Sequence, residues 1–159
     1  MKVFMLTIGT TYYNNPDYLI RFVKLNLAHV DYMIIVDDGS NIPVPDSIKP
    51  SSKIRIFRVK KDYGFNSHGC RNLIMKQTTT DWNILLDVDR EFIDPLKTFR
   101  TIKTKLATLD PHTLYRFIAH ANPDESHISV NDYLIHKSHF FEAGGYDEEI
   151  IGELSLIHI

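Results

Sequence analysis

Short apolar runs alternate with amphipathic stretches along most of the chain, and this pattern predicts a sheet that helices cover on both faces. Four runs are rich in β-branched or aromatic residues and are bounded by polar loops. We expect them to form buried strands at residues 3–8, 32–36, 54–59 and 82–86. Strands that alternate with helices usually form parallel pairs, because the helix carries the chain back across the sheet. The predicted fold class is therefore α/β, with a mostly parallel central sheet flanked by helices.

Two helices are predicted from their start signals and from the spacing of apolar residues. Asn15-Pro16 and Asp94-Pro95 each place a capping side chain before a proline at the first helical position. Apolar residues then recur every three or four positions, which gives each helix one buried face. They are Leu19, Phe22, Val23, Leu27 and Val30 in the first helix, and Leu96, Phe99, Ile102, Leu106 and Leu109 in the second.

The rest of the chain carries signals for two more helices and two more strands. We expect helices at 69–77 and 137–143, and strands at 113–118 and 130–135. A turn is predicted at Asn122-Pro123-Asp124, and Gly144-Gly145 is expected to end the last helix.

Composition excludes several classes of protein. Lys and Arg number 18 against 20 Asp and Glu, and a formal net charge of -2 argues against a net-basic surface for nucleic acid. No apolar run approaches the roughly 20 residues that cross a bilayer, and residues 1–13 have the pattern of a first strand rather than a signal peptide. The single cysteine, Cys70, excludes an internal disulfide and fits a reducing compartment. We therefore expect a cytoplasmic protein of one domain.

Two acidic residues follow the strand predicted at 82–86. Side chains two positions apart on an extended chain point to the same side, so Asp87 and Asp89 are expected to face one point at the sheet edge. Adjacent carboxylates repel each other unless a cation lies between them or one is protonated. A divalent ion that prefers oxygen ligands, Mg²⁺ or Mn²⁺, is the natural partner. An isolated D-x-D is more often only a polar turn.

Two further segments place polar groups beside this pair. Asp37-Asp38-Gly39-Ser40 ends the strand at 32–36, and a free carboxylate there could accept hydrogen bonds from a base or a ribose. The segment 66–72 opens a helix, whose free N–H groups favour an anion, and Arg71 adds a positive charge. Taken singly, the first segment is more simply a turn, and Arg71 is equally well a solvated surface residue.

The joint pattern is more specific than its parts. V-D-D-G-S at 36–40, R-N at 71–72, L-D-V-D at 86–89 and G-G-Y-D-E at 144–148 follow one another in this order. In these motifs and their order the sequence resembles the family 2 glycosyltransferases, whose nucleotide-sugar-binding domain has the GT-A fold. The resemblance extends over residues 3–152 and implies a GT-A domain at 1–152. It implies a metal-dependent enzyme that moves a sugar from a nucleotide-diphosphate sugar, a UDP-sugar, to a hydroxyl acceptor with inversion.

The resemblance also implies roles for single residues. Thr11 and Tyr13, in the loop after the first strand, match positions that contact the nucleotide, and Tyr13 would stack on the base. Asp38 matches the acid that recognises the uracil edge, and Arg71 the basic residue beside the base and phosphates.

Asp87 matches an acid on the ribose side or the metal side, and Asp89 matches the metal ligand proper, for Mn²⁺ or Mg²⁺. Inverting members take their catalytic base from a short acidic motif beyond G-Y-D-E. The remaining acids, Glu148, Glu149 and Glu153, include no Glu-Asp pair, so no catalytic base is assigned.

The missing base leaves a non-catalytic nucleotide-sugar-binding module, or an inactive fragment, as an alternative. A sugar-nucleotide pyrophosphorylase is less favoured, because no Gly-rich phosphate loop follows the first strand. Residues 153–159 depart from the family pattern, and LSLIHI resembles translated adapter sequence. We therefore expect an atypical, artefactual tail on a gene fragment truncated at its C-terminal end.

Other polar residues give weaker signals. His136 and His139 have a spacing that could hold a metal on a helix, but they straddle a predicted strand-to-helix junction, which favours ordinary histidines. Cys70 beside Arg71 could have a lowered pKa, yet without a paired histidine or a second cysteine a catalytic role is disfavoured. Tyr12 and Tyr18 are expected to pack.

Overall fold

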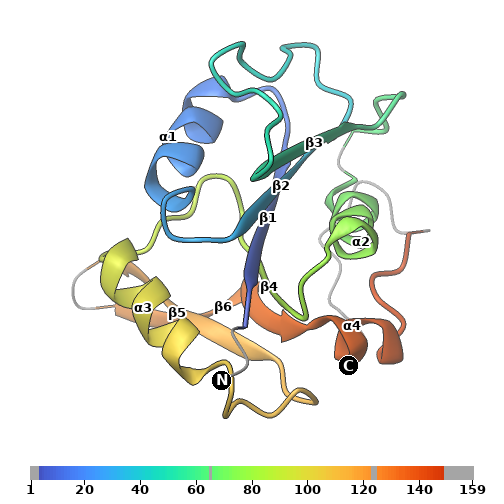
Figure 1. The fold of residues 1–159 in the computed structure, drawn as a ribbon. Coiled ribbons are helices and arrows are strands. Elements are labelled where there is room, and N and C mark those ends of the chain that lie inside the picture. Colours follow the sequence, from blue (N-terminus) through green and yellow to red (C-terminus); the bar gives the residue numbers. More distant parts are fainter. Residues whose placement is uncertain (1–3, 65, 123–124, 149–159) are drawn as a thin grey trace.

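A computed structural model describes residues 4–64, 66–122 and 125–148 of the chain (Figure 1). In chain order the elements are β1 (Leu6–Tyr12), α1 (Pro16–Asn26), β2 (Tyr32–Asp37), β3 (Ile54–Arg58), α2 (Ser67–Gln77), β4 (Trp82–Leu85), α3 (Pro95–Lys105), β5 (Tyr115–Asn122), β6 (Glu125–His136) and α4 (Lys137–Glu142). Among the described residues, no helix has both the length and the apolar character that a membrane span requires.

The strands form one sheet in the order β3-β2-β1-β4-β6-β5. The four strands from β3 to β4 run parallel, whereas β6 runs antiparallel to both β4 and β5. The antiparallel arrangement agrees with the chain length between β5 and β6, since two residues are too few for the crossover that parallel strands need. The predicted α/β class is confirmed, and the sheet is mixed but mostly parallel.

Helices cover both faces of the sheet, as the alternating pattern predicts (Figure 1). On one face, α1 and α3 pack through Phe22 and Phe99 against side chains such as Ile8 and Trp82. On the other face, α2 and α4 contribute Ile74 and Phe140 to a second core cluster. Burying these apolar side chains is the main contribution to the stability of the layers.

The predicted helix starts are confirmed. The Asn15 side chain accepts a hydrogen bond from the amide of Tyr18 (3.4 Å), and the Asp94 side chain accepts one from Lys97 (2.9 Å). Each proline occupies the first turn, where its missing N–H costs nothing.

The first strand differs from its predicted bounds. β1 runs from Leu6 to Tyr12, so T-I-G-T-T-Y is strand and Thr11 lies in it rather than in a loop. β1 is paired on both sides, with β2 and with β4, and this pairing outweighs the loop-like look of Gly9 and the threonines.

Smaller differences concern other bounds. α2 begins two residues before the predicted position, and both β5 and β6 are longer than expected. The predicted turn at 122–124 includes residues 123 and 124, which lie outside the described residues, as does the tail at 153–159.

Candidate functional site

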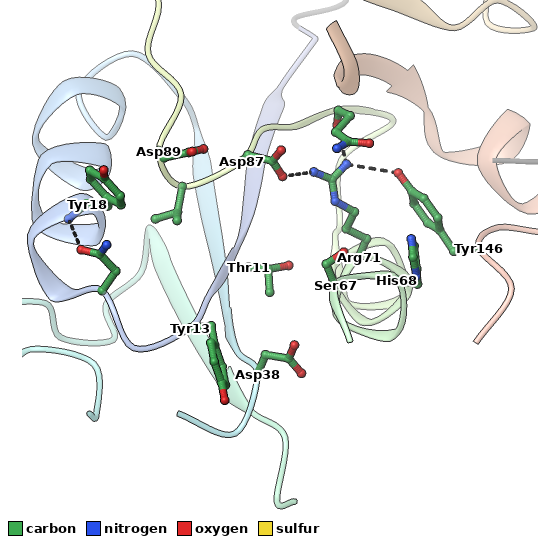
Figure 2. Close-up of a pocket in the computed structure, with 13 residues that line it drawn as sticks. Thr11, Tyr13, Tyr18, Asp38, Ser67, His68, Arg71, Asp87, Asp89 and Tyr146 are labelled. Carbon is green, nitrogen blue, oxygen red and sulfur yellow. Dashed lines mark hydrogen bonds and ion pairs between the residues drawn. The ribbon is translucent and has the colours of Figure 1, made fainter. Parts of the chain in front are cut away.

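A cavity of about 340 Å³ lies at the carboxyl ends of the parallel strands. In open α/β sheets this edge is where ligands bind. Side chains from β1, from the loops after β1, β2 and β4, and from the start of α2 line the cavity (Figure 2). The wall includes all six residues that the sequence singles out, namely Thr11, Tyr13, Asp38, Arg71, Asp87 and Asp89. The fold therefore brings the sequence-predicted residues together, while their roles stay predictions.

Arg71 is buried in the wall, and its guanidinium group is surrounded by acceptors. It donates to Asp87 Oδ1 at 2.5 Å, to the hydroxyl of Tyr146 at 3.1 Å and to the backbone carbonyl of Asn131. In Figure 2 these contacts form a row from Asp87 through Arg71 to Tyr146. A buried arginine needs such partners, since an unpaired buried charge is strongly destabilising. Arg71 thus holds the Asp87 carboxylate in one orientation.

Asp87 and Asp89 lie in a turn rather than in an extended segment. The amide of Arg90 donates to the carbonyl of Asp87 at 3.0 Å, which closes a four-residue turn at 87–90, one residue after the end of β4. The expectation that an extended backbone aligns the two carboxylates is therefore wrong. Both side chains still line the cavity, but Asp87 is tied to Arg71, whereas the carboxylate of Asp89 is exposed and has no bonding partner in the described part of the chain.

Asp132 on β6 supports this turn, and sequence reasoning missed it. Its Oδ1 accepts the amide of Asp87 at 2.8 Å, and its Oδ2 accepts the hydroxyl of Ser129 at 2.5 Å. The side chain is buried, and this burial, together with the charge of Asp87, raises the pKa of Asp132. An acid inside a predicted strand, at 130–135, was the available signal, because such a residue requires partners when buried.

The opposite end of the cavity is formed by Asp38 and Tyr13 (Figure 2). Asp38 is buried, and its Oδ2 accepts the amide of Asn66 at 2.9 Å. Its Oδ1 has no hydrogen-bond partner among the described residues, and burial raises the pKa of this carboxyl group. The ring of Tyr13 is 41% exposed, and its hydroxyl donates to Asp62 Oδ2 at 2.9 Å, which raises the pKa of the phenol.

Gly39 makes this end of the cavity possible. Its φ is +76°, and a Cβ atom at this position would lie 2.9 Å from the backbone of Asp62. Only glycine combines a left-handed backbone with so close an approach. The turn after β2 therefore packs directly on the backbone of Asp62, whose side chain accepts the hydrogen bond from the Tyr13 hydroxyl.

Thr11 also contributes a buried oxygen without a partner. Its Oγ1, like Asp38 Oδ1, has no hydrogen bond among the described residues. Unpaired buried oxygens are uncommon and often mark a site where a ligand or water bonds. Both side chains belong to the cavity wall, so these two oxygen atoms are available to a polar ligand.

Other sequence signals have mixed outcomes. Cys70 is fully buried, and this burial, with the nearby Asp38 charge, raises the pKa of its thiol, so the lowered pKa considered from the sequence is wrong. His136 caps α4 and contacts the Trp82 ring, which is an ordinary structural role. Tyr12 packs in the core as expected, but Tyr18 lines the cavity.

Solved structures with a similar fold include the following three. A mannosyltransferase, PcManGT from Pyrobaculum calidifontis, in complex with GDP-Man and Mn²⁺, is 12% identical, with a TM-score of 0.71 over 92% of this chain and 48% of that one. TarS 1-349 of S. aureus is 15% identical, with a TM-score of 0.65 over 93% and 52%. GalNAc-T7 with UDP, GalNAc and Mn²⁺ is 12% identical, with a TM-score of 0.61 over 98% and 39%. The chain spans about half or less of these proteins, and the likeness confirms the GT-A fold.

A search of curated protein sequences finds no match. The family model described as glycosyl transferase family 2 matches residues 7–98, a range that runs from the second residue of β1 through β4 and the D-x-D turn. This match covers more than half of the chain, so the chain belongs to glycosyl transferase family 2.

Proposed function

We propose that this chain binds the donor of a metal-dependent glycosyltransferase, which moves a sugar from a UDP-sugar to a hydroxyl acceptor. One observation carries the proposal: six residues from separate segments line one cavity at the carboxyl edge of the sheet. The family match supports a transferase, and the solved relatives with GDP-Man or UDP and Mn²⁺ support a nucleotide-sugar donor with a divalent ion.

The nucleoside is assigned to the end of the cavity formed by Asp38 and Tyr13. The exposed Tyr13 ring offers a face on which a base can stack. The free Oδ1 of Asp38 is an acceptor that suits the N–H of uracil after a small rotation of the side chain. Thr11 offers a hydroxyl between this end and the acids.

The diphosphate is assigned to the end with Asp87 and Asp89. Their carboxylates would hold Mn²⁺ or Mg²⁺, with Asp89 as the freer ligand. The ion would stabilise the negative charge that develops on the leaving diphosphate. Arg71 holds the Asp87 carboxylate in one orientation, and its positive charge lies close enough to this acid to favour a bound diphosphate.

The hydroxyl acceptor and the inversion of configuration rest on the family resemblance alone. An inverting reaction needs a base for the acceptor proton. Glu148 accepts a hydrogen bond from Asn72 at 2.7 Å and lies 3.9 Å from Lys76, so it is bound to α2. Glu149 and Glu153 lie outside the described residues. No base is proposed.

Calorimetric titration tests the binding part of this proposal. UDP and GDP are titrated into the chain with and without MnCl₂. We expect UDP to bind more tightly than GDP, and Mn²⁺ to strengthen the binding. Asp89→Ala should weaken binding with Mn²⁺ by about tenfold or more, equal to about 1.4 kcal/mol. Asp46→Ala, an exposed acid outside the cavity, is the control for the change in charge.

The same samples separate an enzyme from a binding module. Release of UDP from UDP-sugars is measured with candidate hydroxyl acceptors and with water. Acceptor-dependent release supports transfer, whereas metal-dependent binding without any release supports the non-catalytic alternative. UDP binding that Mn²⁺ does not strengthen, or that Asp89→Ala does not weaken, would contradict the assignment of the metal site.

A further inference from the structure

A second group of metal-binding side chains lies outside the cavity. His112, His139 and Glu142 each offer one ligand atom, and these atoms all lie within 4.8 Å of one another. His112 belongs to the turn before β5, and the other two lie one helical turn apart on α4. The group thus joins two segments that are distant in sequence.

This group lies near the amino end of β4, whereas the cavity lies at the carboxyl end of the same strand. His136, the last residue of β6, pairs with Trp82, the first residue of β4, and α4 begins directly after it. The D-x-D turn follows the other end of β4. The two sites therefore share no side chain, and the inference below does not depend on the proposed function.

The distances suit a small divalent ion with nitrogen and oxygen ligands. His112 Nδ1 lies 3.3 Å from Glu142 Oε2, and His139 Nδ1 lies 3.9 Å from the same oxygen. Ligands bound to tetrahedral zinc at about 2.0–2.2 Å are about 3.3 Å from each other. One of the three ligand pairs already has this spacing, and side-chain rotations would bring the other two to it.

The surroundings hold the ligands in place and add negative charge. Asp110 accepts the backbone amide of His112 at 2.9 Å and the hydroxyl of Thr113 at 3.1 Å. These hydrogen bonds fix the turn that carries His112 and place the Asp110 carboxylate beside it. The side chain of His139 is only 18% exposed, whereas those of His112 and Glu142 are 66% and 55% exposed. An ion can therefore enter from solvent and retain water.

We propose that His112, His139 and Glu142 form a site for Zn²⁺, with solvent completing its coordination. Two imidazoles and one carboxylate suit Zn²⁺, whereas Mg²⁺ and Ca²⁺ prefer oxygen ligands alone. The ion cross-links the turn before β5 to α4. Because α4 leads through Gly144 and Gly145 to Tyr146 in the cavity wall, this cross-link also anchors one side of the cavity.

Titration with ZnCl₂ tests the site in the wild-type chain and in Asp89→Ala, which removes the freer acid of the D-x-D turn. In both proteins we expect one Zn²⁺ site that excess MgCl₂ does not block, and a higher unfolding temperature with Zn²⁺. His112→Ala and Glu142→Gln change exposed side chains, so the fold should persist. Each should weaken Zn²⁺ binding by about tenfold or more, since each removes a ligand.

His136→Asn is the matched control. It removes the next imidazole on the chain but keeps an oxygen that can cap α4. Zn²⁺ affinity should be unchanged, and Zn²⁺ should shift the imidazole NMR signals of His112 and His139 but not of His136. Absence of Zn²⁺ binding, equal affinity in His112→Ala, or a loss confined to His136→Asn would each overturn the proposal. In the first case the group would be only a contact between polar side chains.

Discussion

The side-chain amide of Asn72 on α2 forms two hydrogen bonds with the backbone of Tyr146. Its Nδ2 donates to the Tyr146 carbonyl at 2.9 Å, and its Oδ1 accepts the Tyr146 amide at 2.9 Å. The Tyr146 hydroxyl in turn accepts a hydrogen bond from Arg71, the next residue back on α2. The R-N dipeptide therefore clamps the G-G-Y segment, so the two short motifs are in direct contact in the fold.

Asn72→Ala should loosen this clamp. Both backbone groups of Tyr146 would lose their partner in a buried place, which costs about 1–3 kcal/mol. We expect the free energy of unfolding in urea to fall by this amount, and the affinity for UDP with Mn²⁺ to fall because Arg71 loses support. Lys76→Ala, on the same helix, removes only a 3.9 Å contact and serves as the control. Unchanged stability in Asn72→Ala would contradict the clamp.

Gly145 is part of the same contact. Its φ is +70°, and a Cβ atom would lie 2.9 Å from Asn72 Oδ1 and 3.1 Å from the Phe140 ring. Gly145→Ala should therefore lower the unfolding temperature more than Gly64→Ala, where φ is +78° but nothing lies within 4 Å. The difference between the two variants measures the steric part of the stability loss, because both positions have a left-handed backbone that strains alanine equally. Equal losses in the two variants would show that the backbone strain alone decides.

Asp132 can be tested as a positioning residue for the D-x-D turn. Asp132→Asn keeps an oxygen for the amide of Asp87, whereas Asp132→Ala removes it. We expect Asn to retain Mn²⁺-dependent UDP binding within a few-fold and Ala to weaken it by about tenfold, an effect of about 1.4 kcal/mol. Binding without Mn²⁺ should change less in both variants. If Ala lowers binding equally with and without Mn²⁺, the role of Asp132 is only structural.

These contacts show which parts of the site could be predicted from the sequence. The carboxyl ends of parallel strands all lie at one edge of the sheet, whatever the conformation of the loops that follow. Asp38 and Asp87 each follow a predicted parallel strand, so they could be placed at the same edge from the sequence. Caps such as Asn15 act within four residues, and for that reason their signals are local. Asp132 reaches the site from an antiparallel strand whose register depends on tertiary pairing, and no local pattern encodes that register.

The same distinction explains the errors. Gly9 looks like a loop residue, but it lies in a central strand that is paired on both sides. Glycine suits this position because α2 approaches closely: a Cβ atom would lie 2.3 Å from Ile74 Cγ2. An extended backbone at Asp87 and Asp89 was expected because the strand before them was expected to continue. In the structure β4 ends at Leu85, and the chain turns at 87–90. Both features depend on neighbours that are far away in sequence.

Gly9→Ala should therefore destabilise the fold. The added methyl group would force Ile74 or the helix to move, and overpacking of this kind costs about 1–3 kcal/mol. Urea unfolding measures the loss. Ile74→Ala creates space at the contact, so the double variant should be more stable than the sum of the two single losses predicts. Strictly additive losses would show that the two residues do not compete for the same space.

Asp38 predicts a dependence of stability on pH. Burial raises the pKa of its carboxyl group in the folded chain, so the fold favours the protonated form. The stability linked to this proton is complete below the unfolded pKa, about 4, and is lost as the pH rises through the folded pKa. Asn resembles the protonated acid in shape and charge. Asp38→Asn should therefore match the wild type near pH 4 and exceed it in stability at neutral pH.

Urea unfolding at several pH values measures this difference, which amounts to about 1.4 kcal/mol for each unit by which the two pKa values differ. Asp46→Asn changes an exposed acid outside the cavity and is the control for the loss of one carboxylate. The same Asp38→Asn protein should bind UDP more weakly, because a neutral amide is a poorer acceptor for the uracil N–H than a carboxylate. Greater stability with weaker binding would identify Asp38 as an acid kept at an energetic cost for its ligand. A wild type that is more stable at neutral pH would contradict this, since the charged carboxylate would then be stabilised by the fold.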